Sequence, residues 1–202
     1  MEVVSGIIMG LDTDKPNTSE ALLAFVEESR IPLLTINLLQ ALPKTPLWDR
    51  LEREGRLIDD EGRDSNVNFL LPYDDVVASW KHAMSVAYEP EKVYARFQYQ
   101  CDHVYVHRLK MPTPDEMKTW PNIRRGLVML RNIFWKVGVL GDYKRVFWKF
   151  ALGRIKRGDL EGLIGCTLIA HHLITFARAA SSGRQNASNY SIRLREAAVP
   201  AE

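Results

Sequence analysis

Residues 3–14 read VVSGIIMGLDTD and contain the clearest structural signal in the chain. The apolar part, residues 3–11, is rich in β-branched side chains and is followed by the polar segment DTDKPN. A short apolar run that is bounded by glycine and turn-forming residues is typical of a buried strand. We therefore expect a strand here, with Asp12 and Asp14 in the turn at its carboxyl end.

The next residues predict a helix and a second strand. Residues 19–30, SEALLAFVEESR, have the pattern of a helix that ends before Pro32, with four apolar side chains expected to face inward: Leu22, Leu23, Phe25 and Val26. Residues 33–42, LLTINLLQAL, are apolar at most positions, which is typical of a parallel strand covered by helices on both faces. Two parallel strands do not form a stable sheet alone, so we interpret this region as the last part of a larger barrel or open sheet.

The rest of the chain predicts helices. Thr45 caps a helix that begins at Pro46 and ends at Gly55, and residues 58–71 form a loop. Helices follow over residues 73–88 and 90–106, then a proline-rich hinge over 111–121, then helices over 121–182 with breaks at Gly138, Gly141 and Gly158. The tail from Ser181 is small and polar, and we expect it to be frayed. The predicted fold class is thus α/β followed by all-α.

Composition restricts the class of protein. A net charge of +2 over 202 residues gives no overall indication of nucleic-acid binding. The two cysteines, Cys101 and Cys166, argue against a disulfide scaffold and fit a reducing cytosol. No apolar stretch reaches the roughly 18 uninterrupted residues of a membrane span, and the N-terminus lacks the basic region of a signal peptide. We expect a cytoplasmic protein, with peripheral contact to the inner membrane as an open alternative.

Polar side chains follow both predicted strands. Asp12 and Asp14 follow the first strand, and Asn37 and Gln40 lie toward the end of the second. Ligands of parallel α/β folds bind at the carboxyl ends of strands, where glycines allow close approach to the backbone. The alternative, favoured by the spacing alone, is that residues 12–17 only form a turn and a helix start. Both interpretations stay open at this point.

Cysteine and histidine spacing does not predict a metal site. Cys101, His103 and His107 match no common zinc pattern and do not share one face of a helix. His171 and His172 are adjacent on a predicted helix and point about 100° apart. We expect packed or surface residues at these positions.

Residues 124–157 combine aromatic side chains with many cations and one acid, Asp142. The cations are Arg124, Arg125, Arg131, Lys136, Lys144, Arg145, Lys149, Arg154, Lys156 and Arg157. The favoured interpretation is a solvated basic face over an aromatic core. Contact with an anionic membrane is the first alternative. Nucleic-acid binding is the second, and we do not expect a nucleic-acid partner.

Four stretches carry a resemblance to a known family: VVSGIIMGLDTDKP, LLTINLLQALPKTPLWDRLEREGRL, NVNFLLP and YEPEKVYARFQ. Together they resemble the C-terminal half of cobalamin-binding radical S-adenosylmethionine proteins, in the subgroup that ends in a helical extension called DUF4070. Hopanoid C-2 methylases are members of that subgroup. The resemblance is specific over residues 1 to about 110 and weaker from 111 to 202, where RGDLEGLIGCTLIAHHLITFAR also suits the extension.

The resemblance implies a fold and a set of site residues. Residues 1–60 would be the last strands of a partial (β/α) TIM-like barrel, residues 61–110 a helical connection that packs on it, and residues 111–202 the helical extension. GIIMGLDTD resembles a fifth strand whose GxIxGxxE motif seats an adenosyl group, although Thr13 stands where many families have Glu. The implied cofactor-binding residues are Gly6, Ile8, Gly10, Asp12, Asp14 and Gln40.

The resemblance also implies an activity for the intact protein. That activity is cobalamin-dependent methylation of an unactivated carbon in a hopanoid-like or porphyrin-like substrate, with S-adenosylmethionine, a [4Fe–4S] cluster and cobalamin as cofactors. The chain lacks the Cys-x3-Cys-x2-Cys loop, so cluster and cobalamin belong to a missing N-terminal portion, and we expect the chain alone to hold no catalytic residue and to be inactive. The alternative is a non-enzymatic remnant or module that binds an anionic membrane surface through its basic helices.

Overall fold

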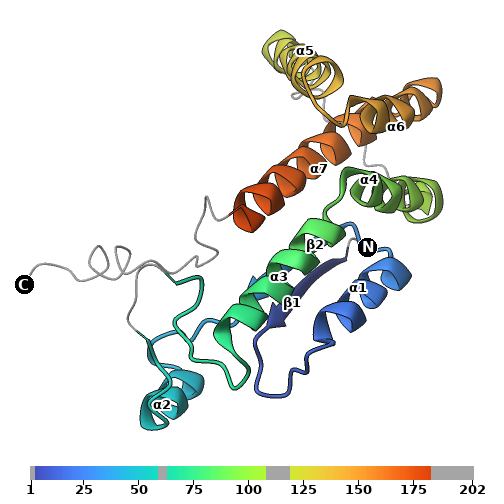
Figure 1. Ribbon diagram of the computed structural model, residues 1–202. Coiled ribbons are helices and arrows are strands. Elements are labelled where there is room, and N and C mark those ends of the chain that lie inside the picture. The colour runs from blue at the N-terminus through green and yellow to red at the C-terminus, as the bar shows by residue number, and fades with distance from the viewer. Residues whose placement is uncertain (1–2, 59–62, 108–118, 183–202) are drawn as a thin grey trace, which may run out of the picture. The chain divides into compact units, whose positions relative to one another are not determined.

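A computed structural model describes residues 3–58, 63–107 and 119–182 (Figure 1). They divide into two compact units. The unit that we call the sheet unit comprises residues 4–29, 33–87 and 177–182, and the helical unit comprises residues 30–32 and 88–176. Most of the predicted hinge at 111–121 and most of the predicted frayed tail from Ser181 lie outside the described residues, and the last residues of the hinge begin a helix at Trp120.

The sheet unit contains a small parallel sheet. Strand β1 (Val4–Met9) pairs with strand β2 (Leu33–Leu38) in a register that places Val4 opposite Leu33 and Met9 opposite Leu38. Helix α1 (Thr18–Ser29) connects them. The predicted strand–helix–strand unit is therefore confirmed, and the order α/β then mostly helical is confirmed with it.

Helices cover one face of this sheet. Helix α3 (Tyr73–Ala87) packs on β2, and α1 packs beside α3. The covered face includes the buried side chains of Leu34, Ile36 and Leu38. Trp80 of α3 is buried and its indole Nε1 donates a hydrogen bond to the carbonyl oxygen of Ile36 at 2.9 Å. This bond satisfies the polar atom that a tryptophan brings into a core.

The other face of the sheet is open within the described residues. Val4 exposes 64% of its surface and Ile8 51%, and the register places both on this face with Gly6 and Thr35. The expectation of helices on both faces is thus not met in the described part of the chain. Within β2 the polar residues Thr35 and Asn37 mark this open face, and the mostly apolar composition of the strand alone does not reveal it.

Helix α1 corrects one expected core residue. Its buried stripe runs through Ser19, Leu22 and Val26. Phe25 exposes 46% of its surface, so the prediction that it faces inward is wrong. It lies beside the stripe, since successive residues of a helix point about 100° apart.

The segment between β2 and α3 is more ordered than a simple loop. Helix α2 (Pro46–Arg53) begins as predicted, with the Thr45 hydroxyl accepting a hydrogen bond from the backbone N–H of Trp48 at 3.3 Å. After it, Leu57 and Val67 form an isolated antiparallel bridge. Val67 and Phe69 are buried, so the described residues 63–71 of this predicted loop pack within the sheet unit.

The helical unit consists of consecutive helices with irregular turns. Its elements are α4 (Pro90–Tyr99), the π-helical turn η1 (Gln100–Val104), the 3₁₀ turn η2 (Tyr105–His107), α5 (Trp120–Ile133), the π-helical turn η4 (Phe134–Val139), α6 (Lys144–Lys156) and α7 (Leu160–Ser181). The predicted breaks near Gly138, Gly141 and Gly158 fall between or at the ends of these elements. The two π-helical turns were not predicted.

Two polar contacts lie in the core of the helical unit. The thiol sulfurs of Cys101 and Cys166 are buried and 3.7 Å apart. Arg154, which is 2% exposed, pairs with the carboxylate of Asp102 on η1, and Arg157 contacts the same carboxylate. A buried arginine requires such a partner, because an unpaired charge in a core is costly.

Helix α7 has an unusual composition. By length and composition alone, α7 is the one described helix that could cross a membrane. Of the 18-residue window that meets this test, 33% is buried within the protein.

Candidate functional site

The turn after β1 is built around Gly10. This residue has a φ of +93°, and a Cβ atom added there would lie 2.5 Å from Cε1 of Phe69. Both the backbone conformation and the packing of Phe69 therefore require glycine. The sequence predicts that a ligand can approach the backbone closely at Gly10. In the structure the ring of Phe69 occupies the space where a side chain at this position would lie.

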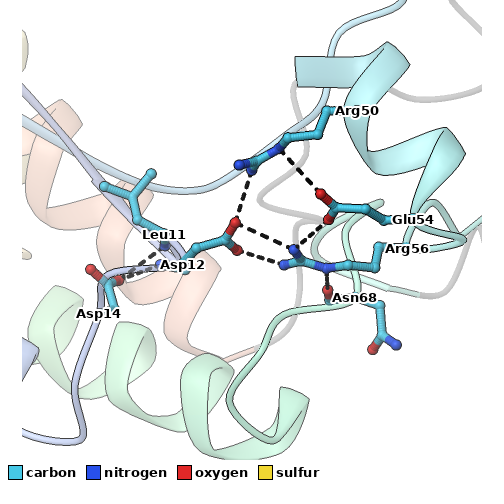
Figure 2. A network of polar contacts seen from close by, with 8 residues as sticks. Leu11, Asp12, Asp14, Arg50, Glu54, Arg56 and Asn68 are labelled. Carbon is cyan, nitrogen blue, oxygen red and sulfur yellow. Dashed lines mark hydrogen bonds and ion pairs between the residues drawn. The ribbon is translucent and has the colours of Figure 1, made fainter. Parts of the chain in front are cut away.

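Asp14 closes this turn. One oxygen of its carboxylate, Oδ2, accepts hydrogen bonds from the backbone N–H groups of Gly10 at 2.7 Å and Leu11 at 3.1 Å (Figure 2). An aspartate that bonds nearby backbone in this way stabilises the turn itself.

Asp12 lies in an ion-pair network with two arginines. Its carboxylate is 2.6 Å from Nη2 of Arg56 and 2.8 Å from Nη2 of Arg50, and Glu54 pairs with Arg56 at 2.9 Å (Figure 2). The hydrogen bond from Arg56 holds the pKa of Asp12 below its usual range, against the opposing effect of burial. Arg56 also donates from Nε to the carbonyl oxygen of Asn68 at 3.0 Å. Asp12 thus ties the turn after β1 to α2 and to the segment before α3.

Gln40 has a similar linking role after β2. Its Nε2 donates to the carbonyl oxygen of Asp64 at 2.7 Å, and its Oε1 accepts from the backbone N–H of Asn66 at 3.3 Å. The Asn66 side chain in turn exchanges hydrogen bonds with both backbone groups of Ala41, at 2.9 and 2.8 Å. These four contacts fix the carboxyl end of β2 against residues 64–66.

Gly6 and Ile8 lie elsewhere, on the open face of the sheet. A Cβ atom at Gly6 would be in ordinary contact, 3.6 Å from the hydroxyl oxygen of Thr35. The backbone of β1 is therefore accessible at Gly6, beside the exposed side chain of Ile8. The predicted site residues form two groups: these two on an accessible surface, and the others in or near the turns that follow the strands.

A pocket of about 340 Å³ opens on the helix-covered side of the turn after β1. Its walls come from that turn, the start of α1 and the start of α3, and include Met9, Asp14, Lys15, Thr18, Asp75 and Ser79. Of the site residues predicted from the sequence, Asp14 is in the described lining of this pocket.

Several residues of this site escape prediction from the sequence. Arg50 and Arg56 are 38 and 44 residues from Asp12 along the chain, and no local pattern indicates that they meet it. The basic, acidic and glycine residues of DRLEREGR suggest only a solvated helix end. Within the described residues, no group of three or more His, Cys, Asp or Glu side chains is arranged to hold a metal ion.

Comparison with known proteins gives related sequences but no solved structure that matches this chain. The chain is 63% identical over 202 residues to the hopanoid C-2 methylase of Rhodopseudomonas palustris (strain TIE-1), covering 100% of this chain and 38% of that protein. It is 32% identical over 178 residues to an uncharacterized methyltransferase of Synechocystis sp., covering 84% of this chain and 32% of that protein.

The chain thus spans about a third of the length of these curated relatives. These relatives confirm the resemblance to hopanoid C-2 methylases that the sequence motifs indicate. Residues 45–186 match the family model described as a domain of unknown function, DUF4070. Since this match covers most of the chain, the protein belongs to the DUF4070 domain family.

Proposed function

We propose that this chain is the C-terminal part of a C-methyltransferase that acts on a hopanoid-like lipid. The observation that carries this proposal is the 63% identity, over the whole chain, to a protein named hopanoid C-2 methylase. The intact enzyme works in the cytoplasm, in peripheral contact with the inner membrane where a hopanoid-like substrate resides. A porphyrin-like substrate is the alternative within the same class of reaction.

The open sheet face supports a larger barrel. β1 exposes Val4 and Ile8 on one side of the sheet, and a two-stranded parallel sheet is not stable as a free-standing element. Strands from an N-terminal portion would extend the sheet into a partial (β/α) barrel and cover these side chains. In this arrangement residues 1–60 complete the barrel, residues 61–110 pack on it, and residues 111–202 form the helical extension.

The residues of the sheet unit fit an adenosyl ligand in part. Gly6 leaves the backbone of β1 open, and Ile8 offers an apolar surface beside it. These two residues would contact S-adenosylmethionine directly. Asp12, Asp14 and Gln40 have their polar atoms engaged within the protein, so they would position the turns around the ligand.

The chain does not fit the other two cofactors. A radical-type [4Fe–4S] cluster needs three cysteine ligands, and the two thiols present lie against each other in the helical core. Cluster and cobalamin therefore belong to the N-terminal portion, where they would supply the radical and methyl-transfer chemistry. The chain alone is expected to bind neither and to methylate nothing.

A chimeric enzyme tests this proposal. The segment of the Rhodopseudomonas palustris methylase that aligns with this chain is replaced by the 202 residues, and the gene is expressed in a strain that lacks the methylase. We expect C-2-methylated hopanoids to reappear in lipid extracts analysed by mass spectrometry, and the chain expressed alone to give none. A chimera that accumulates to the normal level without forming product would contradict the proposal and favour the non-enzymatic module.

A matched pair of substitutions tests the open face. Ile8→Lys places a charge where the barrel strands and the ligand would lie. We expect the amount of product formed by the chimera to fall at least ten-fold. Phe25→Lys changes a side chain of similar exposure on α1 and serves as the control, with product expected to stay unchanged. Equal losses of product in both variants would show that a new exposed charge lowers activity wherever it is placed, and that the open face has no special role.

A further inference from the structure

The segment of α5 and η4 exposes an exceptional amount of apolar surface. Ile133 is the single residue of α5 that is buried in the described structure. Trp120 exposes 70% of its surface, Leu127 56% and Ile123 48%, and Trp135 and Leu140 that follow expose 60% and 67%. Large apolar side chains gathered on one surface segment mark a site of contact with another apolar phase.

The three most exposed apolar side chains of α5 lie on one face of the helix, and Val128 and Met129, which expose 38% and 37% of their surface, lie off this face. Trp120, Ile123, Leu127 and Leu130 follow each other at spacings of three and four residues, which places them in one stripe along one face of a helix. Arg124 and Arg131 flank this stripe on one side. A helix with a tryptophan and leucines on one face, bordered by arginines, has the composition of helices that lie in a membrane interface.

Charge along the same segment is uniformly positive. From residue 119 to 141 the sequence contains Arg124, Arg125, Arg131 and Lys136 and no acid. Within the described residues, the three arginines form no ion pair with an acidic side chain. A surface with this charge is complementary to anionic lipid headgroups.

The base of the segment is firmly held by α6. Phe134 stacks on Trp148 with ring centroids 5.5 Å apart, and the Trp148 indole Nε1 donates to the carbonyl oxygen of Gly138 at 2.9 Å. Gly138 leaves no room for a side chain, because a Cβ atom would lie 2.9 Å from the ring of Phe147. The exposed helix is therefore carried on a rigid support, which positions its stripe as one surface.

From these observations we infer that α5 docks the helical unit on an anionic membrane, with its apolar stripe in the interface and Arg124 and Arg131 at the headgroups. A second copy of the chain fits less well, since packing two stripes together would bring Arg124 and Arg131 of both copies close to one another. This inference rests on the membrane contact in the proposed function and names the surface that makes it, but it does not depend on the methylation.

Vesicle flotation of the 202-residue chain tests the inference. With vesicles of phosphatidylglycerol and phosphatidylcholine at about 0.1 M salt, the chain is expected to float, and with phosphatidylcholine alone to stay in the dense fraction. Leu127→Ser is expected to lower binding by about ten-fold or more. Arg124→Gln and Arg131→Gln are each expected to lower it roughly five-fold.

Two substitutions on α6 are the matched controls. Leu152 exposes 51% of its surface, close to Leu127, and Lys156 is an exposed cation. Leu152→Ser and Lys156→Gln are expected to leave binding unchanged. All five variants alter exposed side chains, so their circular dichroism spectra and thermal unfolding should match those of the unmodified chain, which separates lost binding from lost folding.

Three results would overturn the inference. The first is a folded chain that does not float with anionic vesicles. The second is an equal loss of binding in the α6 controls. The third is a different occupant of the stripe: sedimentation showing a dimer that Leu127→Ser dissociates, or a chimera that no longer floats although the chain alone does. Chimera activity is measured separately, so failure of methylation does not decide this test.

Discussion

At Gly10 the backbone and a neighbouring ring both exclude a side chain. We expect Gly10→Ala to lower the free energy of unfolding by about 3 kcal/mol, since alanine is strained at a φ of +93° and its Cβ would overlap Phe69. Urea unfolding of the 202-residue chain, followed by circular dichroism, measures this loss.

Gly55 provides the control for this substitution. It also has a positive φ, +65°, but a Cβ atom there would meet nothing within 4 Å. Gly55→Ala should therefore cost only about 1 kcal/mol, the conformational part of the effect. Equal losses at the two positions would show that the ring of Phe69 moves aside without cost.

Asp102 lies on the π-helical turn η1 and pairs with Arg154 of α6, so it links these two elements. Burial alone would raise the pKa of its carboxyl, but hydrogen bonds from Gln98, Arg154 and Arg157 outweigh burial and bring that pKa to about 2. The usual value is 3.8. The stabilisation from this carboxylate is therefore complete above about pH 4 and is lost as the pH falls toward 2.

The acid unfolding of an Asp102→Asn variant checks this dependence. At neutral pH the variant should be about 1 kcal/mol less stable than the unmodified chain, since solvent screens a carboxylate that is partly exposed, and the two stabilities should converge as the pH falls from 4 to 2. Glu91→Gln, on the exposed start of α4, should show the unmodified pH dependence. Parallel curves for Asp102→Asn and the unmodified chain would mean that other acids dominate.

The elements of this chain were largely predictable, because their signals are local. Thr45 with Pro46 predicted the start of α2, and the β-branched run before Gly10 predicted β1. The contacts that shape the site were not predictable, since Asp12 and Arg56 lie 44 positions apart along the chain. The π-helical form of residues 100–104 also escaped, because the residue pattern of a π-helical turn resembles that of an α-helix.

At the scale of the whole molecule, two units have separate cores. The core of one gathers around β2, α1 and α3, and the core of the other around α4, α6 and the buried Arg154. We expect Gly10→Ala to raise hydrogen exchange in residues 4–29 and 33–87, and Asp102→Asn to raise it in residues 88–107 and 119–176. Mass spectrometry of peptic fragments reads both regions in one experiment.

A common response would argue against separate units. If either variant raised exchange equally in both regions, the chain would unfold as one cooperative body. A chimera that contains the rest of the methylase should protect the sheet unit further, because added strands would bury the open edges of β1 and β2.

The two faces of β1 also differ in what natural selection acts upon. On the helix-covered face Met9 is buried and Ile7 is half-buried, so a descendant that folds should keep them apolar. Val4 and Ile8 on the open face are under that pressure only while other strands cover them. In a lineage where this segment is encoded without the rest of the enzyme, Val4 and Ile8 should be replaced by polar residues while Ile7 and Met9 stay apolar. The ratio of the substitution rates on the two faces would then date the separation of this segment from the rest of the enzyme.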